Sequence, residues 1–532
     1  MKKLYVGGDI ITMEKEGAEA VLVENGEISQ VLDAANVEPF LSDESIEKVD
    51  LAEKTMLPGF IDPHGHFAMM GLFASLIDLT ACDNFNEIVS TMKTALKERA
   101  ENDDSPLIGF GYDHNFLQEA THPKKDVLNQ VSENLPVFIC HTSIHVGSTN
   151  DAGLQLMNVD ETATDPSGGL IDRVSDSNEP SGYLEEAAWF PILELIFQHS
   201  QEELLSLMEY GQDIYLEQGI TTVQDGATST DYFELFKLLN DRDKLKVDVV
   251  AYPLLPENSD LIEENMSYHK KYKNKLKING YKQLLDGSPQ GRTAWMTEPY
   301  EGEASYSGYP WYKDNQVKSN ILKAVDNDVQ LLTHCNGDAA SDQLLRNYKE
   351  VLEESTNPNK HHLRPVMIHC QTVRDDQLDV MNEIDMIPSI FIAHTYYWGD
   401  AHLKNLGDKR GRRVSPARSA FDKNLVVNFH QDAPVIKPNM IETIWCAVNR
   451  QTRSGKDIGL EQRVSVYEAL QALTINAAYS YFEEDSKGSI KEGKLADFVI
   501  LDKNPLKEEE MNLNNIKVLE TIKEGESMYK RV

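Results

Sequence analysis

Cysteines and long apolar runs are scarce in this sequence. The five cysteines are an odd number, lie far apart and form no Cys-x-x-Cys pair, which disfavours both a disulfide framework and a thiolate zinc site. No stretch reaches the roughly 18 uninterrupted apolar residues of a membrane-spanning helix. The first residues, MKKLYVGGDIITM, also lack the apolar core of a secretion signal. We therefore expect a cytoplasmic protein without a membrane partner.

Basic residues are few as well. The 51 Lys and Arg face 87 Asp and Glu, which gives a formal charge of −36. Such a charge repels phosphate backbones, so we expect no nucleic-acid partner. With 532 residues, 41% of them hydrophobic, the chain is an ordinary globular sequence and is long enough for several domains or one large barrel. Because two-fold assemblies are the commonest oligomers, a homodimer is the default expectation.

Short apolar runs alternate with helical patterns through the middle of the chain. The runs are 219–224, 247–255, 281–285, 329–334, 366–369, 387–392 and 425–429. Strands that alternate with helices pair in parallel, and a count near eight predicts an α/β fold of the (β/α)8 TIM-barrel type that begins at 56–62. Two further runs, 107–110 and 136–140, exceed this count and predict an insertion at about 75–200.

Both ends of the chain have short β-like runs separated by turns. Near the start, Gly7-Gly8 and Asn25-Gly26 separate such runs, and residues 488–502 give strand, turn and strand. The two ends could share one sheet. We therefore divide the chain into an N-terminal part of a β-domain (1–56), a barrel (57–484) and a C-terminal part of the β-domain (485–532).

The most informative segment contains His64-Gly65-His66. Side chains at i and i+2 of an extended segment project to the same face, so two imidazoles can meet one cation. Such a pair alone is weak evidence, because fifteen histidines produce roughly 0.4 pairs of this kind by chance.

Three further candidate ligands stand at the ends of apolar runs: His334, His369 and Asp432. In a parallel barrel these strand ends converge on the C-terminal rim, where catalytic groups lie. For each histidine alone, a hydrogen-bonded rim residue is the better interpretation. Their joint placement favours a metal site.

Seven blocks of the sequence carry a resemblance to a known family. They are Pro58 to His66; His145 to Leu154 with Gly168-Gly169 and Ser181 to Ala187; Lys282 to Ser288 with Arg292; His334 to Asp338; Arg364 to Gln371; Asp432 to Pro434; and Gly488 to Asp502. Over nearly its whole length the chain resembles the amidohydrolase superfamily and, within it, the YtcJ-like metal-dependent hydrolase branch. The resemblance implies a barrel with a composite β-sandwich built from both termini, and hydrolysis by metal-activated hydroxide.

The resemblance also implies roles for single residues. His64 and His66 would hold the more buried metal, and His334 and His369 the outer one. Asp432 would bind metal and act as the general base. Lys282 matches a lysine that is commonly carbamylated, so that its carboxylate bridges two cations. Two alternatives stay open: Lys282 is a rim lysine paired with Asp286 or a glutamate, or Glu186 supplies the bridge.

Other residues in these blocks are candidates for substrate binding. They are His145, Glu186, Arg292 and Trp295, and the planar fork of Arg292 could bind a substrate carboxylate. The chain departs from the family pattern at Gln431, where a serine is usual before the aspartate. It also has Arg364-Pro-Val-Met-Ile-His369 where an acidic residue usually stands beside the ligand.

The chemistry of this residue set predicts an enzyme. A divalent metal lowers the pKa of its water to about 7 and polarises a carbonyl, and imidazole and carboxylate ligands suit zinc, with one or two ions per chain. The leading hypothesis is hydrolysis of a non-peptide C–N bond in a small-molecule linear or N-substituted amide. The alternatives are a mononuclear deaminase or cyclic amide hydrolase, and a noncatalytic metal-binding regulatory barrel.

Overall fold

The chain divides into two compact units in the computed structural model, which describes residues 2–14, 17–100, 103–144, 146–166 and 169–531. Unit 1 comprises Met1–Phe67, Gln212–Ala433 and Lys437–Val532, and unit 2 comprises Ala68–Gly211 with Pro434–Ile436. The predicted insertion, about 75–200, falls within the range of unit 2. The domain boundaries of the sequence analysis stay predictions.

Parallel strands form the centre of unit 1. One sheet has the order β16-β15-β14-β7 and the other β17-β18-β19-β20-β21, and all neighbours are parallel. The strands are β7 (Phe60–Ile61), β14 (Ile220–Thr228), β15 (Asp248–Pro253), β16 (Leu276–Ile278), β17 (Gly280–Leu284), β18 (Gln330–Cys335), β19 (Val366–His369), β20 (Ile387–Ile390) and β21 (Asn428–Phe429).

Backbone hydrogen bonds continue beyond each of these two sheets. Leu255 N–H donates to Lys282 O at 2.8 Å, which links the end of β15 to β17. After β21, Asp432 N–H donates to His64 O at 3.2 Å. The fold of unit 1 is therefore α/β of the TIM-barrel type, while complete closure of the barrel stays a prediction.

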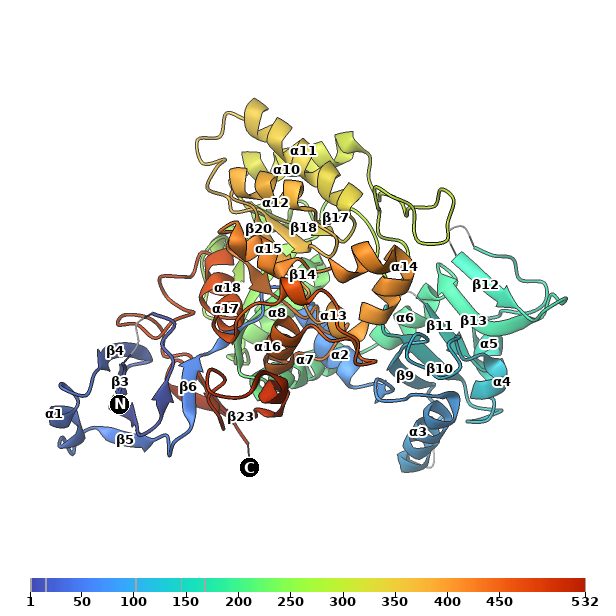
Figure 1. The fold of residues 1–532 in the computed structure, drawn as a ribbon. Coiled ribbons are helices and arrows are strands. Elements are labelled where there is room, and N and C mark those ends of the chain that lie inside the picture. The colour runs from blue at the N-terminus through green and yellow to red at the C-terminus, as the bar shows by residue number, and fades with distance from the viewer. Residues whose placement is uncertain (1, 15–16, 101–102, 145, 167–168, 532) are drawn as a thin grey trace. The chain divides into compact units, whose positions relative to one another are not determined.

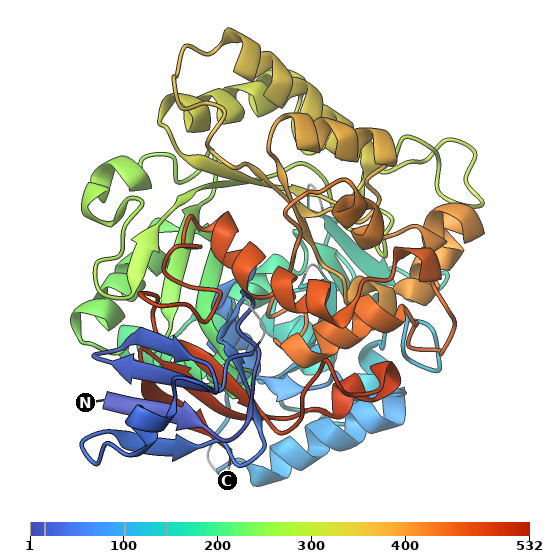
Figure 2. The ribbon, with the colours of Figure 1, turned by 60° about the vertical axis from the view of Figure 1, so that its left-hand side comes forward.

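Helices follow most of the parallel strands (Figure 2). They are α8 (Thr230–Asp241), α9 (Leu261–Glu264), α10 (Asp314–Asp326), α11 (Asp338–Glu354), α12 (Asp375–Glu383), α13 (His394–Tyr397), α14 (Gly399–Arg412), α15 (Ala417–Asp422), α16 (Met440–Asn449), α17 (Val466–Ala472) and α18 (Ile475–Ser480), with 3-10 helices at Met266–Tyr268, Leu460–Gln462 and Glu510–Asn515. In α10 the buried side chains Val317, Ile321, Ala324 and Val325 recur at helical spacing, so one apolar stripe packs and the opposite face stays polar.

The segment predicted as the first barrel strand, 56–62, is two short strands in different sheets. Strand β6 (Thr55–Pro58) pairs with β22 (Phe498–Leu501), whereas β7 joins the parallel sheet. Gly59 lies at the change of sheet, and a Cβ there would approach the Thr221 side chain to 2.7 Å. The backbone therefore passes too close to β14 for any larger residue. The prediction was also wrong in length at 425–429, where only β21 is a strand.

The two ends of the chain share one sheet, as the sequence predicted. This sheet has the order β2-β6-β22-β23-β24 and a second has the order β4-β3-β1-β5 (Figure 1). The strands not yet given are β1 (Lys2–Val6), β2 (Asp9–Ile10), β3 (Ala20–Glu24), β4 (Glu27–Leu32), β5 (Glu47–Asp50), β23 (Val518–Lys523) and β24 (Glu526–Lys530), with α1 (Glu38–Leu41). One apolar cluster includes Tyr5 and Val21 from the start and Phe498 and Ile522 from the end. The assignment as a β-sandwich stays a prediction.

Unit 2 is built on a six-stranded mixed sheet of order β12-β13-β11-β10-β9-β8. Its strands are β8 (Ile77–Asp78), β9 (Leu107–Tyr112), β10 (Val137–His141), β11 (Val146–Thr149), β12 (Gly169–Arg173) and β13 (Pro180–Glu186). The helices of this region are α2 (Phe67–Ala74), α3 (Phe85–Glu98), α4 (Lys125–Leu128), α5 (Asp151–Leu156), α6 (Phe190–Phe197) and α7 (Gln201–Glu217). Among the described helices of the whole chain, none has the length and apolarity to cross a membrane.

Candidate metal centre

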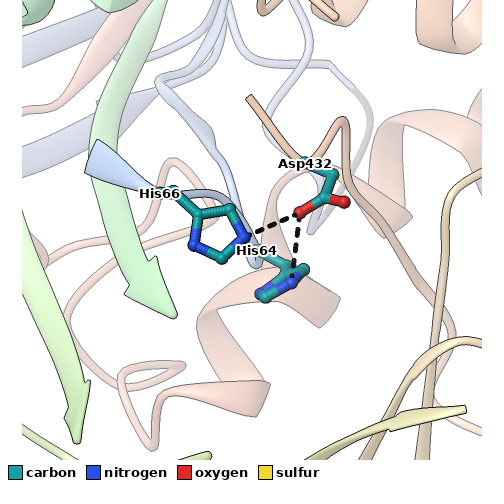
Figure 3. Close-up of side chains that lie close together, drawn as sticks. All are labelled: His64, His66 and Asp432. Carbon is teal, nitrogen blue, oxygen red and sulfur yellow. Dashed lines mark ion pairs between the residues drawn. The ribbon is translucent and has the colours of Figure 1, made fainter. Parts of the chain in front are cut away.

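Two imidazoles and one carboxylate meet at the ends of the parallel strands of unit 1. The Nε2 atoms of His64 and His66 each lie 3.3 Å from Oδ1 of Asp432 (Figure 3). His64 and His66 follow β7 and Asp432 follows β21. Asp432 Oδ1 is buried yet accepts no hydrogen bond of acceptable geometry from the described residues. Three atoms that carry lone pairs therefore converge on one point.

A hydrogen bond to Gln224 fixes the orientation of the His64 ring. The Gln224 amide donates through Nε2 to Pro63 O at 2.6 Å, so its Oε1 faces His64 Nδ1 at 2.6 Å and accepts that N–H. The lone pair of His64 Nε2 then faces Asp432, which is the arrangement of a metal ligand with an outer hydrogen-bond partner. Gly226 is required beside it, because a Cβ there would lie 2.6 Å from the His64 ring.

A second pair of imidazoles lies beside the first. His334 is the second-last residue of β18, and His369 is the last residue of β19. His369 Nε2 lies 2.9 Å from His334 Nδ1. The far nitrogen of His334, Nε2, lies 3.3 Å from Gly287 O, which can accept its N–H. The His64 and His369 ring centroids are 5.6 Å apart. All four predicted histidines and the aspartate are thus gathered at one place.

His430 belongs to the same cluster, although the sequence analysis did not select it. Its Nε2 lies 3.1 Å from His369 Nδ1, and its Nδ1 lies 2.9 Å from the Ser389 hydroxyl. A chain of N–H donors from His369 through His430 to Ser389 leaves the Nε2 lone pair of His369 facing His334. The signal for His430 was present in the sequence, because it precedes Asp432 by two residues, the same spacing that joins His64 and His66.

Lys282 brings an amine to this cluster from β17. Its Nζ lies 3.1 Å from His64 Nε2 and the side chain is buried. No carboxylate of the described residues lies within ion-pair distance of Nζ, and Asp286 instead accepts backbone N–H groups from Asn336, Gly337 and Trp295. Burial lowers the pKa of Lys282 to about 7, although Asp432 acts in the opposite direction.

The protonation states suit a cation. Burial holds the pKa of His64 and His369 well below the usual histidine value and lowers that of His334 to about 3. Burial alone would raise the pKa of Asp432, but the contact with His66 and the other neighbouring imidazoles outweigh it and hold the pKa well below its usual value. At neutral pH His64, His334 and His369 are therefore neutral imidazoles and Asp432 is an ionised carboxylate, the forms that bind metal.

The backbone at two of these residues is strained. His369 has φ 76° and Asp432 has φ 55°, both in the left-handed region that non-glycine residues seldom adopt. Each such conformation costs of the order of 1 kcal/mol and persists where the surrounding structure enforces it, which is often at functional sites.

The donor atoms of this cluster and the distances between them suit a divalent cation. The donor set of imidazole nitrogens and one carboxylate oxygen is that of zinc and related metals. A separation of 3.3 Å between donor atoms matches the edge of a tetrahedron with bonds of about 2.0–2.1 Å. His64, His66 and Asp432 could hold one ion, and His334 and His369 could contribute to a second.

The four predicted substrate-binding residues have different surroundings. Arg292 is paired with Glu303 at 3.0 Å, so part of its fork is occupied. Trp295 is anchored through its backbone N–H to Asp286 Oδ2 at 2.9 Å. Glu186 ends β13 in unit 2, and His145 lies outside the described residues. Their roles stay predictions.

The two departures from the family pattern have structural roles of their own. Gln431 is fully buried, donates to Thr443 Oγ1 at 2.6 Å and accepts the backbone N–H of Asn439 at 2.7 Å, so its amide braces the start of α16. Ile368, which stands beside His369 where an acidic residue is usual, is buried in an apolar cluster with Leu332 and Val366.

The fold and this donor set define a class, that of α/β proteins with a histidine–carboxylate centre at the strand ends. The sequence model of the amidohydrolase family matches residues 47–529. The putative amidohydrolase YtcJ of Bacillus subtilis is 26% identical over 100% of both chains, and the N-substituted formamide deformylase of Arthrobacter pascens is 26% identical over 97% of this chain and 95% of its own. A solved structure, an uncharacterized metal-dependent hydrolase from Pyrococcus horikoshii, has a TM-score of 0.76 at 23% identity, covering 96% of this chain and 99% of that one. The chain belongs to the amidohydrolase family.

Proposed function

We propose that this protein is a metal-dependent hydrolase of a non-peptide C–N bond in a small linear or N-substituted amide. The observation that carries the proposal is the buried Asp432 Oδ1, which has no hydrogen bond of acceptable geometry and stands 3.3 Å from two imidazole nitrogens. Family membership and the name of the deformylase relative support the substrate class. One or two divalent ions, zinc first among them, are the proposed cofactor.

The residues of the centre have distinct tasks in this proposal. His64, His66, His334 and His369 present nitrogen lone pairs, and Gln224 and His430 orient two of these rings. A divalent cation, when bound, polarises the substrate carbonyl and lowers the pKa of water. Asp432, ionised at neutral pH, accepts the proton of the attacking water at Oδ1 and passes it to the leaving nitrogen.

We propose further that Lys282 reacts with carbon dioxide to give a carbamate that bridges two cations. This reaction requires the neutral amine, and the buried Nζ has no carboxylate partner among the described residues, so the interpretation as a salt-bridged rim lysine has little support. With a pKa of about 7, a large fraction of the amine is neutral at pH 7.

The Lys282→Ala variant tests this bridge. We expect the number of tightly bound cations to fall by one and kcat to fall by about 100-fold or more, the loss typical of removing a group that acts in proton transfer or its positioning. A 13C NMR carbamate signal from protein equilibrated with 13C-bicarbonate should be present in the wild type and absent in the variant. A wild type without this signal that still binds two cations at this centre would exclude the carbamate, and Glu186 would become the candidate bridge.

Metal removal tests the function itself. Protein stripped with a chelator should lose turnover of N-acyl and N-formyl amines, and added zinc, manganese or cobalt should restore it. Ammonia release from a ring substrate without acid release would favour the deaminase alternative. A rate unchanged by stripping, or no turnover of any compound by fully loaded protein, would contradict the proposal.

A further inference from the structure

A second group of metal-ligating side chains lies in unit 2, apart from the residues of the proposed function. Asp113 and His114 directly follow β9, and His141 is the last residue of β10. The two strands are parallel neighbours, with His141 paired to Tyr112. Because the carboxyl ends of adjacent parallel strands lie side by side, these three side chains come from one edge of the sheet.

The three donor atoms are spaced as ligands of one ion. His114 Nδ1 lies 3.3 Å from His141 Nε2. Asp113 Oδ1 lies 3.4 Å from that Nε2 and 3.7 Å from His114 Nδ1. Bonds of about 2.0–2.2 Å around a tetrahedral zinc place ligand atoms about 3.3–3.6 Å apart. We propose that Asp113, His114 and His141 form a second divalent-cation site, of the zinc type.

Outer partners hold two of these side chains in place. Asp113 Oδ1 accepts the backbone N–H of Asn115 at 2.8 Å and its side-chain amide at 2.9 Å. His141 Nδ1 lies 2.9 Å from the Ser143 hydroxyl and 3.0 Å from the Ser143 backbone nitrogen. Without a cation the backbone N–H donates to Nδ1, and Nε2 keeps the ring proton toward Asp113. When a cation binds Nε2, the proton moves to Nδ1 and is donated to the Ser143 hydroxyl, the usual outer contact of a ligating histidine.

Aromatic rings cover one side of the cluster, and solvent can reach it from another side. The His122 ring lies against the His114 ring with centroids 4.0 Å apart and stacks on Tyr183 at 4.2 Å. The side chains of Asp113 and His141 are 2% and 8% exposed, but that of His114 is 32% exposed. Three protein ligands with one accessible side leave the fourth position to water or an external ligand. A cation at this site could therefore exchange with solvent, and it would link the end of β9 to the end of β10.

A metal count on the whole protein tests this site. Chelator-treated protein is reloaded with Co²⁺ or Zn²⁺ and desalted, and the bound metal is measured by mass spectrometry. The variants are Asp113→Asn and His141→Gln, with His199→Gln as the control, because His199 is an exposed histidine of the same unit. Loss of one ligand should weaken affinity by about 100-fold or more, since even outer partners contribute 10–100-fold.

We expect both variants to hold one cation fewer than the wild type and the control to match the wild type. Equal counts in all four proteins would overturn the proposal and would mean a hydrogen-bonded polar cluster only. If the variants fail to fold, the wild type decides. An anomalous peak at the zinc edge between the three donor atoms supports the site, and no peak at saturating zinc overturns it. Neither outcome depends on amide turnover, so this site and the proposed function succeed or fail separately.

Discussion

Replacement of Asp432 by asparagine should nearly abolish turnover. The change keeps the size of the side chain but removes the carboxylate charge, so the proton of the attacking water has no acceptor at Oδ1. Proton transfer by a positioned group contributes about 10²–10⁴-fold to rate, and the same oxygen faces His64 and His66 at 3.3 Å. We therefore expect kcat to fall by about 10³-fold or more, measured by acid or amine release under saturating zinc.

The matched control for this variant is Asp422→Asn. Asp422 is an exposed aspartate that pairs with Arg418 at the end of α15, and its replacement should leave kcat unchanged. Far-UV circular dichroism of both variants excludes a folding defect. If folded Asp432→Asn retains more than a tenth of the wild-type kcat, Asp432 is not the base and the mechanism proposed here is wrong.

Apolar runs were sufficient to locate most of the parallel strands. The runs 247–255 and 366–369 contain β15 and β19, and the run 329–334 covers all of β18 except Cys335, because strands covered on both faces are continuously apolar. The errors have a physical cause. Residues 56–61 have no charged or hydrogen-bonding side chain. Whether they pair with β22 or with β14 depends on chain segments more than 150 residues away, and no local pattern records that choice.

The sequence also predicted that the candidate metal ligands lie close together, because local spacing and strand-end positions determine this. The i and i+2 spacing of His64 and His66, together with the position of Asp432 at a strand end, predicts that the three side chains lie on one rim. The supporting contacts were not predictable in this way. Gln224 lies inside the buried strand β14, and only the fold brings its amide within 2.6 Å of His64. For Lys282, the sequence is compatible both with an amine that pairs with Asp286 and with an amine that contacts His64. Only the fold distinguishes the two.

The largest stability effect should come from a buried charge cluster in unit 1, remote in sequence from the metal centre. Asp248 at the start of β15 lies 2.6 Å from Lys487 Nζ and 2.8 Å from Lys523 Nζ. The three side chains are at most 5% exposed. Lys523 ends β23, so Asp248 joins the parallel strands to the sheet that both termini build.

Asp248→Asn removes the carboxylate that both lysines share, although Lys487 keeps Glu483 at 2.6 Å and Lys523 keeps Asp497 at 2.9 Å. Removing one partner of a buried ion pair costs about 3–5 kcal/mol, and we expect a loss of this order in the free energy of unfolding by urea at pH 7. Glu383→Ala, which breaks the exposed pair with Lys349, is the control and should cost less than about 1 kcal/mol. A difference below about 1 kcal/mol for Asp248→Asn would contradict the argument.

The pH dependence gives this prediction a second measurement. Burial alone would raise the pKa of Asp248, but the ammonium groups of Lys487 and Lys523 outweigh it and hold the pKa below its usual value. A carboxyl with a depressed folded-state pKa contributes stability that is complete above its unfolded pKa, near 4, and is lost as pH falls toward the folded pKa. The stability gap between wild type and Asp248→Asn should therefore be constant from pH 5 to 7 and narrow below about pH 4. A stability gap that widens on acidification would contradict the assignment of this pH dependence to Asp248.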